Sequence, residues 1–220
     1  MLTALLFDLD GTLTDTDTLH LQAFRDLLLE HDGRELSTAE FETKVSGRAN
    51  QALFADLFPE RSPAERQALA ERKEALFRER SPHLQPLPGL LRVLEHARRM
   101  KHGLCVVTNA PRLNAEHMLR AMGLEQAFDH VLVAEELSRA KPDPLPYLTG
   151  LQRLGARAAQ ALAFEDSLPG VAAATAAGIF TVGLSTTQPA QRLLQAGAQL
   201  VIEDFDDPRL WALLDSHGQA

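Results

Sequence analysis

The sequence contains little cysteine and no long apolar run, and each scarcity excludes a class of protein. Cys105 is the only cysteine among 220 residues, which excludes disulfide frameworks and cysteine metal clusters. It lies in the apolar run GLCVVTN, where a small buried hydrophobic residue is expected. No stretch of 18 apolar residues occurs, and the opening MLTALLF is too short for a signal peptide and is interrupted by Asp8. We therefore expect a cytoplasmic protein without a membrane span.

Positive charge is also scarce. The chain has 22 Lys and Arg against 30 Asp and Glu, a net charge of -8, which opposes non-specific binding to nucleic acids and anionic membranes. Only four of the 22 basic residues are lysines. With 45% hydrophobic residues the chain is long enough to bury a core as one domain, or as one domain with a large insertion. We expect a monomer with no nucleic-acid or membrane partner, in which any anionic ligand meets a local cluster of positive charge.

Short apolar runs alternate with helical patterns over most of the chain. The apolar runs cover residues 3–9, 103–108, 130–134, 161–166, 179–184 and 198–202. The helical patterns cover approximately residues 89–101, 112–122, 143–154, 168–177 and 189–196. Apolar runs of this length are typical of strands buried on both faces. The alternation predicts an α/β fold with a doubly wound, parallel, Rossmann-like sheet.

One region breaks the alternation. Residues 15–83 read as consecutive helices, and the charged run AERQALAERKEALFRER (64–80) is expected to be a solvated helix face. The segment SPHLQPLPG (81–89) contains three prolines and suits a stiff return linker. We therefore expect an α/β core formed by residues 1–14 and 84–220, with residues 15–83 inserted as an all-helical cap.

Polar residues follow several of the predicted strands. In an open parallel sheet, ligands bind outside the carboxyl ends of the strands, so these positions are expected to share one crevice. Lysine 141 precedes a proline, which favours an extended backbone at that point. The residues at these ends are Asp8, Asp10, Thr108, Asn109, Lys141, Glu165 and Asp166.

The stretch LLFDLDGTLTDTD places two carboxylates beside a single leucine at the end of the first strand. Residues two apart on a strand face the same side, so Asp8 and Asp10 can face one ligand. Their repulsion is tolerable only if one is protonated or a cation lies between them. Together with Asp166 they predict an oxygen-rich Mg²⁺ site, at which a phosphate dianion could approach the aspartates.

With a phosphate in place, these residues suggest a phosphoryl-transfer mechanism. Asp8 is the candidate nucleophile that forms an acyl phosphate. Asp10 is the candidate acid that protonates the leaving oxygen and the base that later deprotonates water. Lys141 and the hydroxyl of Thr108 would hold the equatorial oxygens, over which charge is spread.

Four segments in order resemble the motifs of the haloacid dehalogenase superfamily, in the group with a helical cap after the first strand. These are FDLDGTLTD, VVTNA, AKPDP and FEDSLPG, and the resemblance covers essentially the whole chain. The group includes relatives of beta-phosphoglucomutase and phosphoglycolate phosphatase. The resemblance implies Asp8 as nucleophile, Asp10 as acid and base, Lys141 as anchoring cation, Thr108 and Asn109 as phosphoryl-binding groups, and Glu165 with Asp166 at the metal.

The resemblance favours phosphate chemistry, because the true dehalogenases of the superfamily lack a second aspartate at the position of Asp10. The choice between a phosphatase and a mutase stays open. Thr16 and His20 match the mutase pattern, whereas Thr12 and the TNA of the second motif do not. The cap loop TKVSGRANQAL (43–53) also departs from that pattern, because the basic residue directly follows the glycine.

The cap supplies the candidate substrate contacts His20, Lys44, Gly47 and Arg48. The alternative interpretation of His20 is a packed histidine. The alternative interpretation of Lys44 and Arg48 is a solvated basic patch. Our reading is a Mg²⁺-dependent phosphatase of a small phosphorylated metabolite, such as a sugar phosphate, that works through a phosphoaspartate. The alternatives are a beta-phosphoglucomutase-like hexose-phosphate mutase and, third, a non-catalytic binding module.

Overall fold

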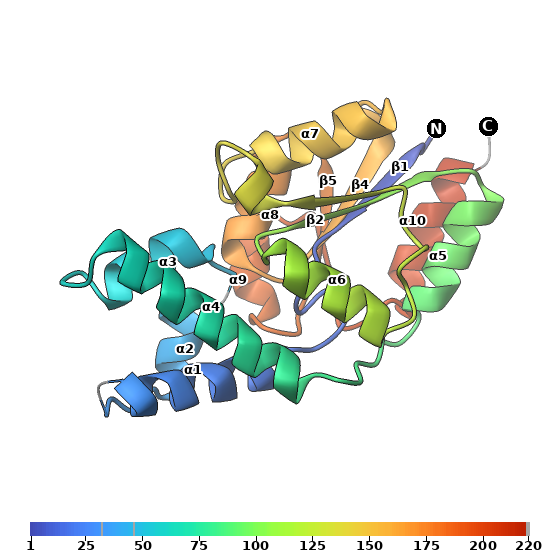
Figure 1. Cartoon of the computed structure of the whole chain (residues 1–220). Helices are drawn as coiled ribbons and strands as arrows, with labels where there is room; N and C mark the ends of the chain where they lie inside the picture. Colours follow the sequence, from blue (N-terminus) through green and yellow to red (C-terminus); the bar gives the residue numbers. More distant parts are fainter. Residues whose placement is uncertain (32, 46, 219–220) are drawn as a thin grey trace.

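The computed structural model describes residues 1–31, 33–45 and 47–218. At its centre lies a six-stranded sheet in the order β3-β2-β1-β4-β5-β6 (Figure 1). The strands are β1 (Ala4–Phe7), β2 (Gly103–Thr108), β3 (His130–Val133), β4 (Ala161–Glu165), β5 (Phe180–Leu184) and β6 (Leu200–Ile202). All neighbouring strands pair in parallel. The strand order reverses between β1 and β4, so the predicted doubly wound parallel sheet is confirmed.

The apolar run of β1 forms the middle of the sheet because both of its faces are covered. Every residue of β1 is buried, and Leu6 pairs with Cys105 on one side and Ala163 on the other. Alternate residues enter different clusters: Phe7 stacks on Phe164 with ring centroids 4.7 Å apart, whereas Leu6 belongs to the opposite face. A strand that is apolar throughout can bury all of its side chains only in the middle of a sheet that is covered on both faces.

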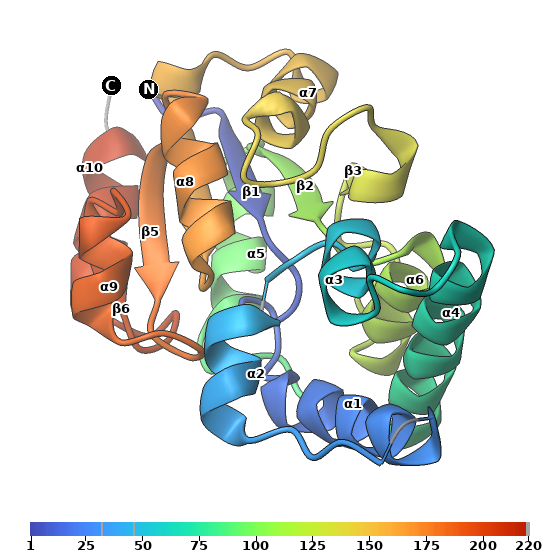
Figure 2. The ribbon, with the colours of Figure 1, turned by 90° about the vertical axis from the view of Figure 1, so that its left-hand side faces the viewer.

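Helices cover both faces of the sheet (Figures 1 and 2). One apolar cluster packs α5, α6 and α10 on the face that carries Phe7, and the other packs α7 and α8 on the face that carries Leu6. Helix α9 packs beside β5 and β6. The bounds are α5 (Leu90–Arg99), α6 (Arg112–Ala121), α7 (Leu145–Leu154), α8 (Leu168–Ala176), α9 (Ala190–Gln195) and α10 (Pro208–Gly218), with short 3₁₀ turns at η1 (Ala134–Glu136) and η2 (Ala158–Gln160).

Four helices between β1 and α5 form what we call the helical insertion. They are α1 (Asp17–His31), α2 (Thr38–Lys44), α3 (Asn50–Leu57) and α4 (Pro63–Arg80). Helix α4 begins with a capping box in which Ser62 and Glu65 exchange hydrogen bonds, with Pro63 in the first turn. Figure 2 shows the insertion beyond the arrowheads of β1 and β2. The helices therefore face the edge of the sheet at which ligands bind in this architecture.

Two expectations need correction. The charged run of α4 is not simply a solvated face, because Lys73 and Glu74 are only 4% and 5% exposed. Both residues face the strand ends, and their partners are described below. Helix α10 was not predicted, although Pro208 at its start and buried Leu210 and Leu214 at helical spacing were signals for it. In the part of the chain that the structure describes, no helix is long and apolar enough to cross a membrane.

Candidate active site

The first candidate, Asp8, directly follows β1 at the carboxyl edge of the sheet. Its backbone N–H donates to the carbonyl of Phe164 at 2.9 Å, which continues the strand ladder by one residue. The chain then turns at Gly11, whose φ of +70° favours glycine. A Cβ there would lie 2.2 Å from the Asp166 carboxylate. Gly11 thus lets the first loop pass directly against the end of β4.

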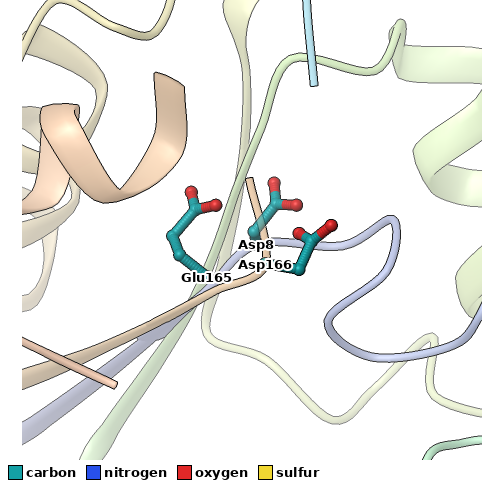
Figure 3. A group of neighbouring side chains, drawn as sticks. All are labelled: Asp8, Glu165 and Asp166. Atoms are coloured by element: carbon teal, nitrogen blue, oxygen red, sulfur yellow. The ribbon is translucent and has the colours of Figure 1, made fainter. Parts of the chain in front are cut away.

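Three carboxylates gather at these strand ends. One oxygen each from Asp8, Glu165 and Asp166 lies within 4.8 Å of the others, and all three residues are buried. Figure 3 shows the three side chains next to one another above the strand ends. Thr12 and Thr187 donate hydrogen bonds to the two oxygens of Asp166, at 3.1 and 2.6 Å. We call these three acidic residues the acidic cluster.

One cation is inserted into the acidic cluster. The Lys141 ammonium lies 2.7 Å from Asp8 Oδ1 and 2.5 Å from Glu165 Oε1. The hydroxyl of Tyr147 donates to the same Glu165 oxygen at 2.6 Å. A Cβ at Gly170 would lie 1.9 Å from Glu165, so the start of α8 can approach this carboxylate only as glycine. The predicted convergence of Asp8, Lys141 and the β4 end is present in the structure.

The acidic cluster has more negative charge than its lysine can neutralise. Burial raises the pKa of Asp8 to about 7 despite the attraction of Lys141. Burial, with repulsion from Asp8, also raises the pKa of Asp166 well above its ordinary value. The two carboxylates raise the pKa of Lys141 and outweigh the opposing effect of its burial. Three close carboxylate oxygens with a deficit of positive charge are a donor set that fits Mg²⁺.

Asp10 has different surroundings. Its Oδ1 accepts a hydrogen bond from the Thr16 hydroxyl at 2.8 Å and lies 2.8 Å from His20 Nε2. Burial alone would raise the pKa of Asp10, but His20 and Thr16 outweigh it and hold the pKa below its ordinary value. The predicted metal role of Asp10 is not reflected in its side chain, which belongs to this second network rather than to the acidic cluster.

His20 is held between Asp10 and the helical insertion. Its ring stacks on Phe77, with centroids 3.9 Å apart and planes 3° from parallel. Lys73 Nζ lies 3.0 Å from His20 Nδ1. An ammonium can only donate, so Nδ1 accepts, and the ring proton is placed on Nε2, where it points at Asp10. The structure thus gives His20 a hydrogen-bonded position rather than that of a merely packed side chain.

Thr108 ends β2 beside the same cavity, and Asn109 directly follows it. The Thr108 hydroxyl oxygen accepts from the backbone N–H of Ala110 at 2.9 Å. The Asn109 amide donates to the carbonyls of Gly47 and Lys141, at 3.1 and 3.3 Å, and accepts from the Lys141 N–H. Asn109 therefore connects the core to the helical insertion and positions the backbone of Lys141.

A cavity of about 80 Å³ lies between the strand ends and the helical insertion. The predicted residues that line it are Asp8, Asp10, His20, Gly47, Arg48, Thr108, Asn109, Lys141 and Asp166. Glu165 is fully buried and is not part of the described lining. The structure does not bring Lys44 to the cavity, since its ammonium is exposed and pairs with Glu40 at 3.2 Å. The cavity combines carboxylates, a buried ammonium and apolar walls.

Comparison with known proteins decides the family. The family model of haloacid dehalogenase-like hydrolases matches residues 5–184. The chain belongs to this family. The predicted family resemblance is thereby confirmed, together with the fold that it implied.

Relatives in this hydrolase family align over nearly the whole chain. The validoxylamine A 7'-phosphate phosphatase of Streptomyces hygroscopicus is 34% identical, over 93% of this chain and 94% of its own. The phosphorylated carbohydrates phosphatase of Thermotoga maritima is 30% identical, over 91% and 94%. The crystal structure of CbbY from Rhodobacter sphaeroides in complex with phosphate is 25% identical, over 98% and 100%, with a TM-score of 0.87. These similarities extend over at least 91% of this chain and therefore include the insertion.

The site residues that the sequence prediction missed include Asn50, Lys73, Glu74 and Asn114, which all line the cavity of this hydrolase. A signal for two of them existed. Lys73 and Glu74 lie one helical turn after the buried Leu69 and Ala70, and one turn before Phe77. A charged pair within an apolar helical stripe indicates a buried polar site rather than a solvated face. Asn50 and Asn114 carry no comparable signal.

Proposed function

We propose that this hydrolase is a Mg²⁺-dependent phosphatase that hydrolyses a small phosphorylated metabolite, a sugar phosphate or similar phosphomonoester, through a phosphoaspartate on Asp8. The observation that carries the proposal is the position of the Asp8 carboxylate. It is buried at the cavity, 2.7 Å from Lys141 and within the acidic cluster. The named relatives support the substrate class, because two of them are phosphatases of phosphorylated carbohydrates or a related phosphate ester.

The acidic cluster is the proposed metal site. Asp8, Glu165 and Asp166 would hold Mg²⁺, because their oxygens converge and one lysine leaves negative charge uncompensated. When bound, Mg²⁺ supplies positive charge that lets the phosphate dianion approach the carboxylates and that stabilises the charge of the transition state. Thr12 and Thr187 orient Asp166 by their hydrogen bonds to it.

The chemistry proceeds in two steps. An oxygen of Asp8 attacks phosphorus, and the bond from phosphorus to the leaving oxygen breaks. Asp10 donates a proton to that oxygen, so it has to enter this step protonated: the approach of the phosphate dianion must raise the pKa of Asp10, which His20 and Thr16 hold low in the free protein. Water then attacks the phosphoaspartate, and Asp10 takes a proton from the water. The bond from phosphorus to Asp8 breaks, inorganic phosphate leaves, and both aspartates regain their initial state. His20 and Thr16 hold Asp10 at the cavity for both proton transfers.

The surrounding residues position the phosphoryl group. Lys141 borders both the cavity and the acidic cluster, so its ammonium can bind a phosphoryl oxygen while it holds Asp8. The Thr108 hydroxyl is the second proposed phosphoryl contact. Asn109 acts through the backbone of Lys141 and through Gly47. The insertion, which closes the cavity from the other side, would exclude bulk water from the reaction.

We favour hydrolysis over the mutase reaction. A mutase must bind a bisphosphate, which requires cations at the far side of the cavity that are free to bind a second phosphate. Arg48 lines the cavity, but its guanidinium lies 2.5 Å from Asp56. The departures from the mutase pattern at Thr12 and in the loop before α3 agree with this preference.

The proposal is tested by phosphate release. The purified protein is incubated with hexose phosphates, glycerol phosphate and phosphoglycolate, with Mg²⁺ or with EDTA, and inorganic phosphate is measured. We expect release that requires Mg²⁺. The Asp166→Asn variant should need at least about tenfold more Mg²⁺ for half-maximal activity, whereas Asp206→Asn, at an exposed ion pair with Arg92, should match the wild type. Phosphate release that is unaffected by EDTA and by Asp166→Asn would overturn the metal assignment.

A further inference from the structure

The two basic side chains on the insertion side of the cavity occur in ion pairs. Lys73 Nζ lies 3.0 Å from Glu74 Oε1, and both side chains are almost fully buried. Arg48 lies 2.5 Å from Asp56 Oδ2. Among the described residues, these are the two cations that the insertion contributes to the lining. Each of them is therefore already neutralised by a carboxylate of the insertion itself.

Glu74 is the central residue on the insertion side of the cavity, where Arg48, Asn50 and Lys73 also belong to the lining. We call these four residues the wall. The Oε1 of Glu74 accepts from Lys73 and from the Asn50 amide at 2.7 Å, and its Oε2 accepts from the Asn114 amide at 2.5 Å. Asn114 belongs to α6, so Glu74 also connects the insertion to the core. Burial alone would raise the pKa of Glu74, but Lys73 and the hydrogen bond from Asn50 outweigh it and lower the pKa. Glu74 is thus an anion with a fixed orientation.

The wall determines which chemical groups can be bound on the leaving group of the substrate. A carboxylate offers about four lone-pair positions, and the three donors leave room for a further donor such as a hydroxyl group. A second phosphate or a carboxylate at this place would meet Lys73 and Arg48 already paired with Glu74 and Asp56, and would lie against the Glu74 carboxylate. Like charges in a desolvated site repel strongly. Hydroxyl groups meet acceptors and amides here, whereas a second anion meets cations that are already paired and a carboxylate of fixed orientation.

We propose that Glu74 is a specificity-determining residue, which makes the site accept phosphomonoesters with an uncharged, hydroxyl-bearing leaving group and reject substrates with a second anionic group. The inference rests on the proposed phosphatase function and narrows its substrate class. It also separates the role of Glu74 from that of the acidic cluster, which acts on the phosphoryl group that every substrate shares.

The experiment compares two matched pairs of substrates. These are fructose 1-phosphate with fructose 1,6-bisphosphate, and glycerol 3-phosphate with 3-phosphoglycerate. The measured quantity is the ratio of kcat/KM within each pair, at a fixed concentration of free Mg²⁺. For the wild type we expect the compound with one anionic group to be preferred by at least about tenfold.

Glu74→Gln removes the charge at nearly constant shape. We expect it to reduce the preference by at least about fivefold, mainly through a lower KM for the compound with two anionic groups. Glu79→Gln is the matched control, since Glu79 is an exposed carboxylate on the same helix, and its ratio should equal that of the wild type. A ratio that Glu74→Gln leaves unchanged would overturn the proposal.

A second variant keeps the test decisive if Glu74→Gln does not fold. Asp56→Asn releases Arg48 from its exposed partner and should shift the ratio toward the compounds with two anionic groups. A wild-type ratio near unity, or equal ratios for wild type and Asp56→Asn, would then contradict the proposal. The absence of phosphate release from all four compounds and from the wider panel would instead refute the phosphatase function.

Discussion

At the scale of single residues, Gly47 is a point of close approach between the insertion and the core. Its φ is +74°, and a Cβ would lie 2.7 Å from the Cβ of Ser167 at the start of α8. Its carbonyl accepts from the Asn109 amide. Glycine thus permits both the left-handed turn and the contact between the insertion and the strand ends.

Gly47→Ala should therefore impair activity beyond its effect on stability. Gly33 is a matched control, because its φ is +67° and no atom lies within 4 Å of its Cβ position. We expect each alanine to lower the free energy of unfolding by about 1 kcal/mol, measured by urea denaturation. Only Gly47→Ala should also lower kcat/KM, by about tenfold or more. Equal kcat/KM values for the two variants would show that the contact with Ser167 has no role in catalysis.

The residues at the strand ends were predictable from the sequence, and the wall of the insertion was not. Parallel strands bring Asp8 and Asp166 to one edge whatever the surrounding detail, so local patterns sufficed for these two. Lys141 lies in the loop after β3, and the order of the four motifs indicated its place. The position of Asn114 depends on how α4 packs against α6, and such packing has no short-range sequence signal. Lys73 and Glu74 are intermediate, because the helical period indicates burial without naming a partner.

At the scale of elements, α4 is connected to α6 through one amide side chain. Asn114 donates to Glu74 and accepts from Arg78 at 2.6 Å. His117, one turn further along α6, lies 2.8 Å from the carbonyl of Ser81. These polar contacts add to an apolar cluster that the insertion shares with the core, to which Phe24 and Phe77 of the insertion and Phe7 of the sheet belong.

Asn114→Ala should weaken the closed arrangement of α4 on α6. Hydrogen bonds to charged groups contribute about 1.5–3 kcal/mol, so we expect KM for a phosphomonoester to rise by about tenfold. The kcat should change less, because Asn114 does not contact the acidic cluster or Asp10 in the network described. Steady-state kinetics check this, with the exposed Glu116→Ala on the same helix as control. An unchanged KM with a reduced kcat would contradict the assigned role.

The elements themselves follow closely from the sequence patterns. Each predicted apolar run contains a strand, because only a two-sided sheet can bury it on both faces. Helix α10 was missed although Asp207 accepts from the N–H of Arg209 and precedes Pro208, which is an ordinary helix start. Its apolar side is completed only by packing against the sheet, where Leu210 and Leu214 join the main core.

At the scale of the whole molecule, a buried histidine pair lies beyond the amino end of β2, opposite the end that carries Thr108. His96 and His102 pack with ring centroids 6.3 Å apart, next to Trp211 of α10. Within the described residues, His96 Nε2 and His102 Nδ1 have no hydrogen-bond partner. Burial, with a smaller effect of His96, lowers the pKa of His102 below its ordinary value of 6.5.

His102 should make the protein less stable in acid. The unfolded chain binds a proton at His102 near pH 6.5, and the folded chain resists it until a lower pH. The free energy of unfolding should therefore fall as the pH drops below 6.5 toward the folded-state pKa. His102→Phe should show a smaller fall between about pH 7.5 and about pH 5.5 than the wild type or the exposed His83→Gln. Parallel pH profiles in urea denaturation for all three would refute the contribution of His102.

The fold, the acidic cluster and the cavity lead to one central claim, which is that Asp8 carries the phosphoryl group during turnover. The most direct measurement is rapid acid quenching of the protein with a phosphomonoester and Mg²⁺, followed by intact-protein and peptide mass spectrometry. We predict a gain of one phosphoryl group on the peptide that contains Asp8, removable by hydroxylamine, and neither this gain nor phosphate release in Asp8→Asn. A phosphoryl group on another residue, or phosphate release by Asp8→Asn at the wild-type rate, would contradict the account.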